Sequence, residues 1–207
     1  MAIYLIRHGE TPGNRDRVVQ VAQTPLSPRG LEQARRLGRR LADHPIERIL
    51  ASDLARADMT ARCLHEATGV AVESEPLLQE RNLGDLRGTP YAELDSDPFA
   101  PGYAPPGGET WEVFHLRVDA AWARVRAAAA DLEGGHLAVV THGLVLHSLA
   151  VRHLDLPAVV PRAPDDGPPL RFGNTALSIV ASTAPFSVEL FACTGHLEGT
   201  EAEGALI

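Results

Sequence analysis

The chain alternates short apolar runs with longer stretches in which apolar residues recur every three or four positions. The short runs are typical of buried strands, and the recurring spacing is typical of amphipathic helices. Predicted strands cover residues 2–6, 46–51, 70–72 and 137–140. Predicted helices begin at Ser27-Pro28, Ser52, Thr110 and Leu144, and end near Leu41, Gly69, Gly134 and Leu154. Serine or threonine can cap the free amides of a first turn, and glycine favours a helix end.

Strands that alternate with helices predict a mainly parallel sheet with helices on both faces. Two β-rich runs, 176–181 and 186–192, flank Thr183-Ala184-Pro185 and predict an antiparallel pair. We therefore expect an α/β fold, a three-layer α/β/α arrangement whose mostly parallel sheet has an antiparallel edge strand. Ligands of such sheets bind at the carboxyl ends of the strands, near the point where the strand order reverses.

Polar segments rich in proline and glycine connect these elements. Residues 9–24 are predicted to form a long functional loop, and residues 80–108 an irregular segment. Segments 95–108 and 155–170 are the candidates for a lid over a bound ligand. Four aromatic residues lie in or beside the first of these segments: Tyr91, Phe99, Tyr103 and Trp111. Because aromatic side chains mostly pack, a local hydrophobic plug is favoured over stacking on a substrate.

The length of 207 residues predicts a single domain spanning 1–207, because domains usually contain about 100–200 residues. Hydrophobic residues make up 44% of the chain and charged residues 22%, which is typical of a globular protein and not of a disordered one. The last residues, 193–207, are predicted to form a loose tail.

The formal net charge of -8 excludes a general attraction to nucleic acid or to an anionic membrane surface. The chain contains no lysine, which excludes Schiff-base chemistry on a lysine. Cys63 and Cys193 lack a paired spacing, which favours a reducing compartment over a disulfide scaffold. We recognise neither a signal segment nor an apolar stretch of spanning length. The expectation is a soluble cytoplasmic protein.

Two predicted strands end in a histidine that is followed by glycine. His8 follows Arg7 at the end of the first strand, and His142 ends the strand at 137–140. The carboxyl ends of parallel strands meet at one edge of a sheet, so both imidazoles are expected there. Arg56 falls in the first turn of a predicted helix, where free amides and the helix dipole favour an anion. This pattern points to a phosphate site with a histidine that can attack phosphorus.

Five motifs together resemble the histidine phosphatase superfamily, in the branch that includes cofactor-dependent phosphoglycerate mutases and related phosphatases. The motifs are Leu5-Ile6-Arg7-His8-Gly9-Glu10-Thr11 with Asn14, Ser52-Asp53-Leu54-Ala55-Arg56-Ala57 with Thr60-Ala61, Leu78-Gln79-Glu80-Arg81-Asn82-Leu83-Gly84 with Arg87-Gly88, Pro106-Gly107-Gly108-Glu109-Thr110, and Val140-Thr141-His142-Gly143. They occur in the family's order and span most of the chain. The resemblance implies a phosphoglycerate mutase-like fold.

The resemblance also implies a role for each matching residue. His8 would be the nucleophile that takes the phosphoryl group, and Glu80 would be the proton donor. The residues implied to contact the substrate are Arg7, Asn14, Arg56, Glu80, His142 and Gly143, with Arg7, Arg56 and His142 around the phosphate oxygens. His8 must be neutral to attack, and repulsion from the arginines favours that state. Glu80 must begin protonated, so we expect an activity optimum on the acid side of neutrality.

Two positions depart from the family pattern. Gln23 stands where relatives usually carry an Asp two residues before the proline, in a loop that borders the site. Relatives also often carry an arginine a few residues after His142-Gly143, where this chain has Leu144-Val145-Leu146-His147. His147 is predicted to be a helix residue with an ordinary hydrogen bond and no contact with the substrate.

These residues favour a metal-independent phosphomonoesterase that acts on a small phosphorylated metabolite, with no cofactor. A cofactor-dependent phosphoglycerate mutase is the main alternative, although residues 88–108 lack the paired arginines that such mutases carry there. A non-catalytic protein that binds a phosphorylated ligand is a second alternative. A zinc hydrolase has little support, because His142 and His147 are five residues apart and would not share a helix face. Pairing of the edge strand near 186–192 would give a homodimer.

Overall fold

The structure is a computed structural model that describes residues 1–158, 160 and 170–200. Its sheet contains the strands β1 (Ala2–Arg7), β2 (Ile46–Ala51), β3 (Val72–Ser74), β4 (His136–Thr141), β5 (Leu177–Ala181) and β6 (Val188–Cys193). Their order across the sheet is β3-β2-β4-β1-β5-β6. The first four strands in this order pair in parallel, whereas β5 pairs antiparallel with both β1 and β6. The predicted α/β fold is confirmed, and β6 forms the edge beside the antiparallel strand β5.

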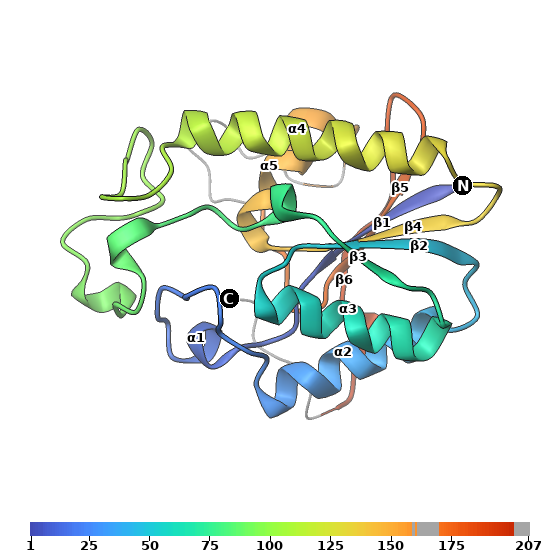
Figure 1. Ribbon diagram of the computed structural model, residues 1–207, viewed down its shortest axis with the longest axis horizontal. Helices are drawn as coiled ribbons and strands as arrows, with labels where there is room; N and C mark the ends of the chain where they lie inside the picture. The colour runs from blue at the N-terminus through green and yellow to red at the C-terminus, as the bar shows by residue number, and fades with distance from the viewer. Residues whose placement is uncertain (159, 161–169, 201–207) are drawn as a thin grey trace.

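Helices cover both faces of the sheet, as Figure 1 shows, with α4 and α5 on one side and α2 and α3 on the other. The helices are α1 (Pro12–Arg15), α2 (Pro28–Leu41), α3 (Ala55–Thr68), α4 (Trp111–Ala130) and α5 (Gly143–His153). Short 3-10 turns are η1 (Pro76–Leu78), η2 (Gly84–Leu86), η3 (Tyr91–Glu93) and η4 (Gly195–Leu197). Among the described residues no helix is both long and apolar enough to span a bilayer.

The continuous apolar run of β1 packs against the helices on both faces of the sheet. Ile3 and Leu5 pack into the core with α4 and α5, whereas Tyr4 and Ile6 pack into the core with α2 and α3. Successive strand residues point to opposite faces, so a strand that is buried on both faces needs apolar residues at every position. This pattern holds the carboxyl end of β1 rigidly in the middle of the sheet.

Three predicted boundaries were wrong. The helix α3 begins at Ala55 with Leu54 as its N-cap, because the hydroxyl of Ser52 bonds to the ring of His142. The strand β3 begins at Val72 and not at Val70, because the carbonyl and amide of Val70 still bond to side chains at the end of α3. The loop at 9–24 contains α1, whose N-cap Thr11 forms a reciprocal capping box.

The prediction of a loose tail from residue 193 is also wrong as far as residue 200. Arg40 donates to the sulfur of Cys193, and the hydroxyl of Thr175 lies 2.9 Å from Nε2 of His196. The side chain of Leu197 is buried. Residues 201–207 lie outside the described residues, as do residues 159 and 161–169 of the second lid candidate.

The loop that follows β1 rests directly on α2, and we predict that Gly30→Ala disrupts this contact. A Cβ at Gly30 would lie 1.9 Å from the carbonyl oxygen of Glu10, so the loop or the helix would have to move. Overpacking of this kind costs about 3 kcal/mol or more in the free energy of unfolding. We expect a fall of roughly 6–12 °C in Tm. Arg35→Ala, at an exposed position of the same helix, is the matched control, and equal Tm values for the two variants would contradict the prediction.

Candidate active site

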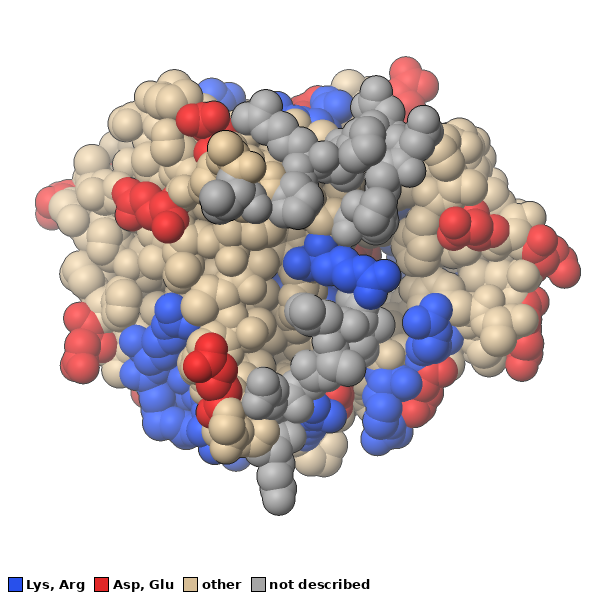
Figure 2. All heavy atoms as spheres, turned by 180° about the vertical axis from the view of Figure 1, so that it is seen from behind, with Lys and Arg blue, Asp and Glu red and all other residues tan. Residues whose placement is uncertain are grey.

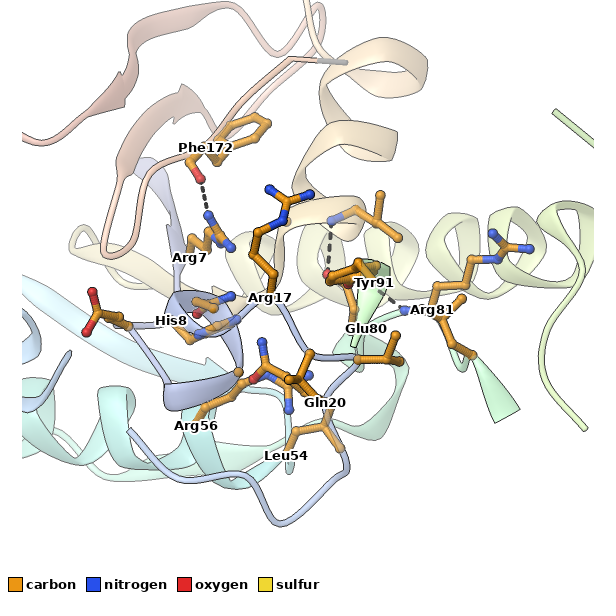
Figure 3. A pocket seen from close by; sticks show the side chains of 18 of the residues that line it. Arg7, His8, Arg17, Gln20, Leu54, Arg56, Glu80, Arg81, Tyr91 and Phe172 are labelled. Atoms are coloured by element: carbon orange, nitrogen blue, oxygen red, sulfur yellow. Dashed lines mark hydrogen bonds between the residues drawn. The ribbon is translucent and has the colours of Figure 1, made fainter. Parts of the chain in front are cut away.

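A pocket of about 670 Å³ opens at the carboxyl ends of the parallel strands. β1 and β4 lie side by side, and the helices that follow them, α2 and α5, pack on opposite faces of the sheet. The crevice between two such connections is where parallel sheets bind ligands. Figure 3 shows Arg7, His8, Arg56 and Glu80 around this space, from different elements. All four line the pocket, as do Asn14 and Gly143.

His8 is held at the end of β1 by backbone bonds on both sides. Its N–H donates to the carbonyl of Thr141 at the end of β4, and its own carbonyl accepts from Thr175 N and from Asn174 Nδ2. Its ring Nδ1 lies 2.7 Å from the carbonyl of Gly9. Because a carbonyl can only accept, Nδ1 carries the hydrogen, and the neutral ring keeps its lone pair on Nε2. Nε2 is therefore the ring nitrogen whose lone pair is available to act as a nucleophile.

Two guanidinium groups lie next to His8, and each has a hydrogen-bond donor without a partner among the described residues. Arg56 is buried in the first turn of α3, where Nη1 donates to the carbonyl of Val21. Arg7 donates through Nη1 to the carbonyl of Phe172. The Nε atoms of both arginines are buried and have no partner among the described residues. Buried donors are normally satisfied, so these two indicate the place of an anionic ligand.

His142 supplies a second imidazole, 5.1 Å from His8 between ring centres. Its Nε2 lies 2.8 Å from the hydroxyl of Ser52, which fixes the ring. The other ring nitrogen, Nδ1, is buried and has no partner among the described residues. His142 is also the N-cap of α5, so the free amides of the first turn, including that of Gly143, lie at this edge of the site.

Glu80 is positioned by backbone groups from two segments. One carboxyl oxygen accepts from the amide of Leu144 at 3.1 Å, and the other accepts from the amide of Arg81 at 3.2 Å. The backbone leading to Glu80 is in turn clamped by Arg117, which donates to the carbonyls of Leu77, Gln79 and Glu80 and pairs with the carboxylate of Glu109 at 2.7 Å. The carboxyl group therefore has a fixed place at the N-terminus of α5.

Asn14 is oriented by the donors from which its side-chain oxygen accepts hydrogen bonds. That oxygen receives bonds from the amide and hydroxyl of Thr11 and from Asn174 Nδ2. The side-chain NH2 group is the remaining donor of Asn14. Asn14 therefore presents a donor to the pocket, as an anion requires.

Burial and charge together set the protonation states of the site. Burial lowers the pKa of His8 well below its ordinary value, and repulsion from Arg56 and Arg7 lowers it further. Burial raises the pKa of Glu80, against the opposing effect of hydrogen bonds and of the same arginines. The pKa of Arg56 falls to about 10, so it remains cationic at neutral pH. When both histidines are neutral and Glu80 is protonated, the forms that these shifts favour, Arg7 and Arg56 leave two positive charges, which match a phosphate dianion.

Comparison with known proteins identifies the family. Residues 3–184 match the histidine phosphatase superfamily (branch 1). The chain belongs to the histidine phosphatase superfamily. It is 32% identical over 188 residues to a probable phosphoglycerate mutase GpmB from Enterobacter sp. (strain 638), a match that covers 86% of this chain and 83% of the relative.

Solved structures of phosphatases are similar in fold to this histidine phosphatase chain. The α-ribazole phosphatase of Shigella flexneri aligns with a TM-score of 0.76 and 26% identity, over 94% of this chain and 97% of its own. A mycobacterial glucosyl-3-phosphoglycerate phosphatase aligns with a TM-score of 0.72 and 26% identity, over 93% of this chain and 98% of its own. Phosphatases and a probable mutase are therefore both among the proteins that this chain resembles.

The structure brings the predicted site residues of this family member together at one pocket, which all of them line except His142, buried behind its wall against His8. Sequence reasoning missed several other residues. Neither the clamp formed by Arg117 and Glu109 nor the Ser52 bond to His142 was predicted, because each joins segments far apart in the chain. Six further arginines line the pocket without a predicted role, and the side chains of three of them, Arg17, Arg87 and Arg171, have no hydrogen bond or ion pair among the described residues. Their clustering has no signal in the spacing of the sequence, since each comes from a different loop.

Arg81 organises the first lid candidate, residues 95–108. This buried guanidinium donates to the carbonyls of Pro98, Tyr103 and Glu109 and lies 3.9 Å from the ring centre of Trp111. Trp111 is half-buried and packs against the apolar core and the ring of Phe114, so the predicted hydrophobic plug is present at this residue. By contrast, Tyr91 and Phe99 line the pocket with their ring centres 5.7 Å apart, where a substrate can contact them.

The two departures from the family pattern lie differently with respect to the pocket. The loop that contains Gln23 borders the pocket as predicted, through Gln20, Val21 and Ala22, whereas Gln23 itself is exposed outside it. His147 is in α5 as predicted, but it also lines the pocket, and its Nδ1 has no partner among the described residues. Within the described ranges no group of three His, Cys, Asp or Glu residues could hold a metal ion.

Proposed function

We propose that this chain is a metal-independent phosphomonoesterase that hydrolyses a small phosphorylated metabolite through a phosphohistidine on His8, with Glu80 as proton donor and acceptor. One observation carries the proposal. The hydrogen bond from Nδ1 to the Gly9 carbonyl leaves the lone pair of His8 on Nε2, beside the unsatisfied donors of Arg7 and Arg56. A nucleophile, a dianion site and an acid thus meet in one pocket.

In the first step, Nε2 of His8 attacks phosphorus while the bond from phosphorus to the ester oxygen breaks. Glu80 transfers its proton to the departing alkoxide, so the alcohol leaves neutral and Glu80 becomes a carboxylate. The guanidinium groups of Arg7 and Arg56 and the donors of His142 and Asn14 hold the three equatorial phosphoryl oxygens, where charge is concentrated in a loose transition state.

In the second step, a water molecule takes the place of the alcohol. The carboxylate of Glu80 accepts a proton from this water, whose oxygen forms a bond to phosphorus as the bond from phosphorus to Nε2 breaks. Inorganic phosphate leaves, His8 is again neutral and Glu80 is again protonated. The same two residues therefore serve both half-reactions, and the pocket returns to its starting charge.

A phosphoglycerate mutase is the second candidate. The similarity to a probable phosphoglycerate mutase supports it, and so do the additional arginines in the pocket, because a mutase must hold a second acidic group. Residues 88–108 contain no arginine, so in a mutase the arginines that hold the second acidic group would have to come from other segments. We favour the phosphatase because a mutase requires that water be kept from the phosphohistidine until a second acceptor binds.

The decisive experiment measures phosphate and alcohol release from glycerol 3-phosphate, ribose 5-phosphate, p-nitrophenyl phosphate and 3-phosphoglycerate in the presence of EDTA. We expect equimolar release of both products, and a phosphorylated protein in samples quenched with alkali. Isomerisation of 3-phosphoglycerate with a bisphosphate primer, without net phosphate release, would establish the mutase instead. Turnover that EDTA abolishes would overturn the proposed mechanism.

A further inference from the structure

We propose that the outer part of the pocket is a second anion site, formed by Arg17, Arg87 and Arg171, and that the substrate is a small phosphomonoester with a second anionic group. The inference rests on the proposed function, since the phosphoryl group must occupy the inner site beside His8. The inner site binds only the phosphoryl group, whereas the outer site would select the rest of the substrate, the part that is not transferred.

Arginines inside and outside the pocket differ in how they are paired. Outside the pocket, every described arginine except Arg35, Arg40 and Arg126 forms a salt bridge with a carboxylate. Within the pocket the described arginines that form none are Arg7, Arg17, Arg56, Arg81, Arg87 and Arg171. In a chain of net charge -8, carboxylates are plentiful, so the unpaired cations are concentrated where a ligand binds.

Three of these pocket arginines already have a use. Arg7 and Arg56 belong to the phosphoryl site, and the guanidinium of Arg81 is occupied by three backbone carbonyls. The side chains of Arg17, Arg87 and Arg171 are exposed and have no hydrogen bond or ion pair among the described residues. Carboxylates and phosphates accept the paired N–H groups of a guanidinium and neutralise its charge, whereas a hydroxyl of a neutral sugar or alcohol accepts them singly and leaves the charge in place.

Backbone pairing brings Arg17 and Arg87 to the same rim. The amide of Gly88 donates to the carbonyl of Val19 at 2.7 Å, and the amide of Tyr91 donates to the carbonyl of Arg17 at 2.9 Å. Val18 forms an isolated bridge with Pro90 between these two contacts. Arg17 itself has a φ of 54°, which is costly for a residue with a side chain and is maintained here by the pairing.

Each outer arginine lines the same pocket as the phosphoryl site. The guanidinium carbon of Arg17 lies 5.9 Å from the ring centre of Tyr91, and Figure 3 shows Arg17 between Arg7 and Tyr91. Arg171 precedes Phe172, whose carbonyl accepts from Arg7. The charge of Arg87 acts on Arg56 and contributes to lowering its pKa. A ligand that reaches from His8 to these side chains is therefore of small-metabolite size, in keeping with a pocket of about 670 Å³.

The surface as a whole does not share this positive character. On the face that Figure 2 shows, acidic side chains are spread around the margin, and basic side chains, all of them arginine, also lie toward the middle. A general polyanion such as nucleic acid would meet acidic residues beyond the pocket. A small ligand with two anionic groups stays within the pocket, which, among the described residues, eight arginines line against two carboxyl side chains, Glu10 and Glu80.

The test compares pairs of phosphomonoesters that differ only in the second group. Glycerol 3-phosphate and 3-phosphoglycerate differ by a carboxylate, and fructose 6-phosphate and fructose 1,6-bisphosphate differ by a phosphate. We expect wild type to prefer the doubly anionic member of at least one pair in kcat/KM, and the pair shows which anion the site takes. Arg17→Gln, Arg87→Gln and Arg171→Gln should each reduce that preference about tenfold, the effect of one lost charge-assisted hydrogen bond.

Arg35→Gln is the matched control, because Arg35 is exposed, unpaired with a carboxylate among the described residues, and outside the pocket. It removes the same charge and should leave the preference unchanged. Equal turnover of both members of each pair by wild type would overturn the second anion site and leave the proposed phosphatase intact. An equal loss on both members in the three variants, or the same loss in Arg35→Gln, would also overturn it. Absence of turnover on every ester would refute the proposed function itself.

Discussion

His8→Asn abolishes phosphate release from every phosphomonoester, with a fall in kcat of about 10⁵ or more, the scale seen when a covalent nucleophile is removed. Asparagine is the sharpest replacement, because its side-chain NH2 can occupy the place of Nδ1 and donate to the carbonyl of Gly9. The variant therefore retains the local hydrogen bond and loses only the attacking atom. Alkaline-quenched samples of the variant should contain no phosphorylated protein.

His65→Ala is the control for this prediction, because His65 is exposed on α3 and lies outside the pocket. It should retain the wild-type rate. The Tm of His8→Asn should remain within a few degrees of wild type, since no large side chain is removed from the core. Phosphate release by His8→Asn within tenfold of wild type, from a folded protein, would exclude the phosphohistidine mechanism.

Glu80→Gln lowers kcat on an alkyl phosphate such as glycerol 3-phosphate by about 10²–10⁴, the usual contribution of a positioned general acid. Glutamine keeps the shape of the side chain and can still accept from one of the two amides, that of Leu144 or that of Arg81, through its single oxygen, but it has no proton to transfer. The loss should be much smaller on p-nitrophenyl phosphate, because a nitrophenolate is stable enough to leave without protonation. Thr68→Ala, at the far end of α3, is the control and should retain both rates. A similar loss on the two esters would show that Glu80 acts only by positioning the substrate.

The pH profile of wild type follows from the same two residues. Glu80 donates only when protonated, so the rate on an alkyl phosphate is present below its pKa, which burial raises, and is lost as the pH rises through that value. His8 attacks only when neutral, so the rate is lost at low pH only as the pH falls through its pKa, which burial and the neighbouring arginines lower. The two limbs enclose an optimum on the acid side of neutrality. A constant rate from pH 5 to 9 on the alkyl ester would contradict the role of Glu80.

The amino-acid sequence alone determined the elements and the inner site of this protein. Apolar runs at 2–6 and 137–140 predicted strands buried on both faces, which placed His8 and His142 at the carboxyl edge of one sheet, and β1 does pair with β4 in parallel. Ser27 caps α2 and Gly69 ends α3 in the left-handed conformation, as predicted, because capping depends on residues that are neighbours in the chain. The motif resemblance then assigned roles to residues whose proximity follows from this topology.

Only the tertiary structure decided which side chains hold those residues and what surrounds them. Ser52 could serve as a helix cap or as a partner of His142, and the packing of β4 beside β2 chose the second. The fold also decided what lowers the pKa of His8 most. The sequence suggested repulsion from the neighbouring arginines, whereas in the structure burial has a larger effect than those charges.

The outer arginines show the same division between sequence and structure. Arg17, Arg87 and Arg171 have no periodic spacing. They line one pocket because loop 17–19 pairs with residues 88–91, and because the carbonyl of Phe172, the residue after Arg171, accepts from Arg7. Local patterns reach only as far as a turn of helix or a strand, whereas a pocket is assembled from loops whose approach depends on the whole packed sheet. The sequence therefore specified the chemistry at the strand ends, and the fold specified the anion-binding wall around it.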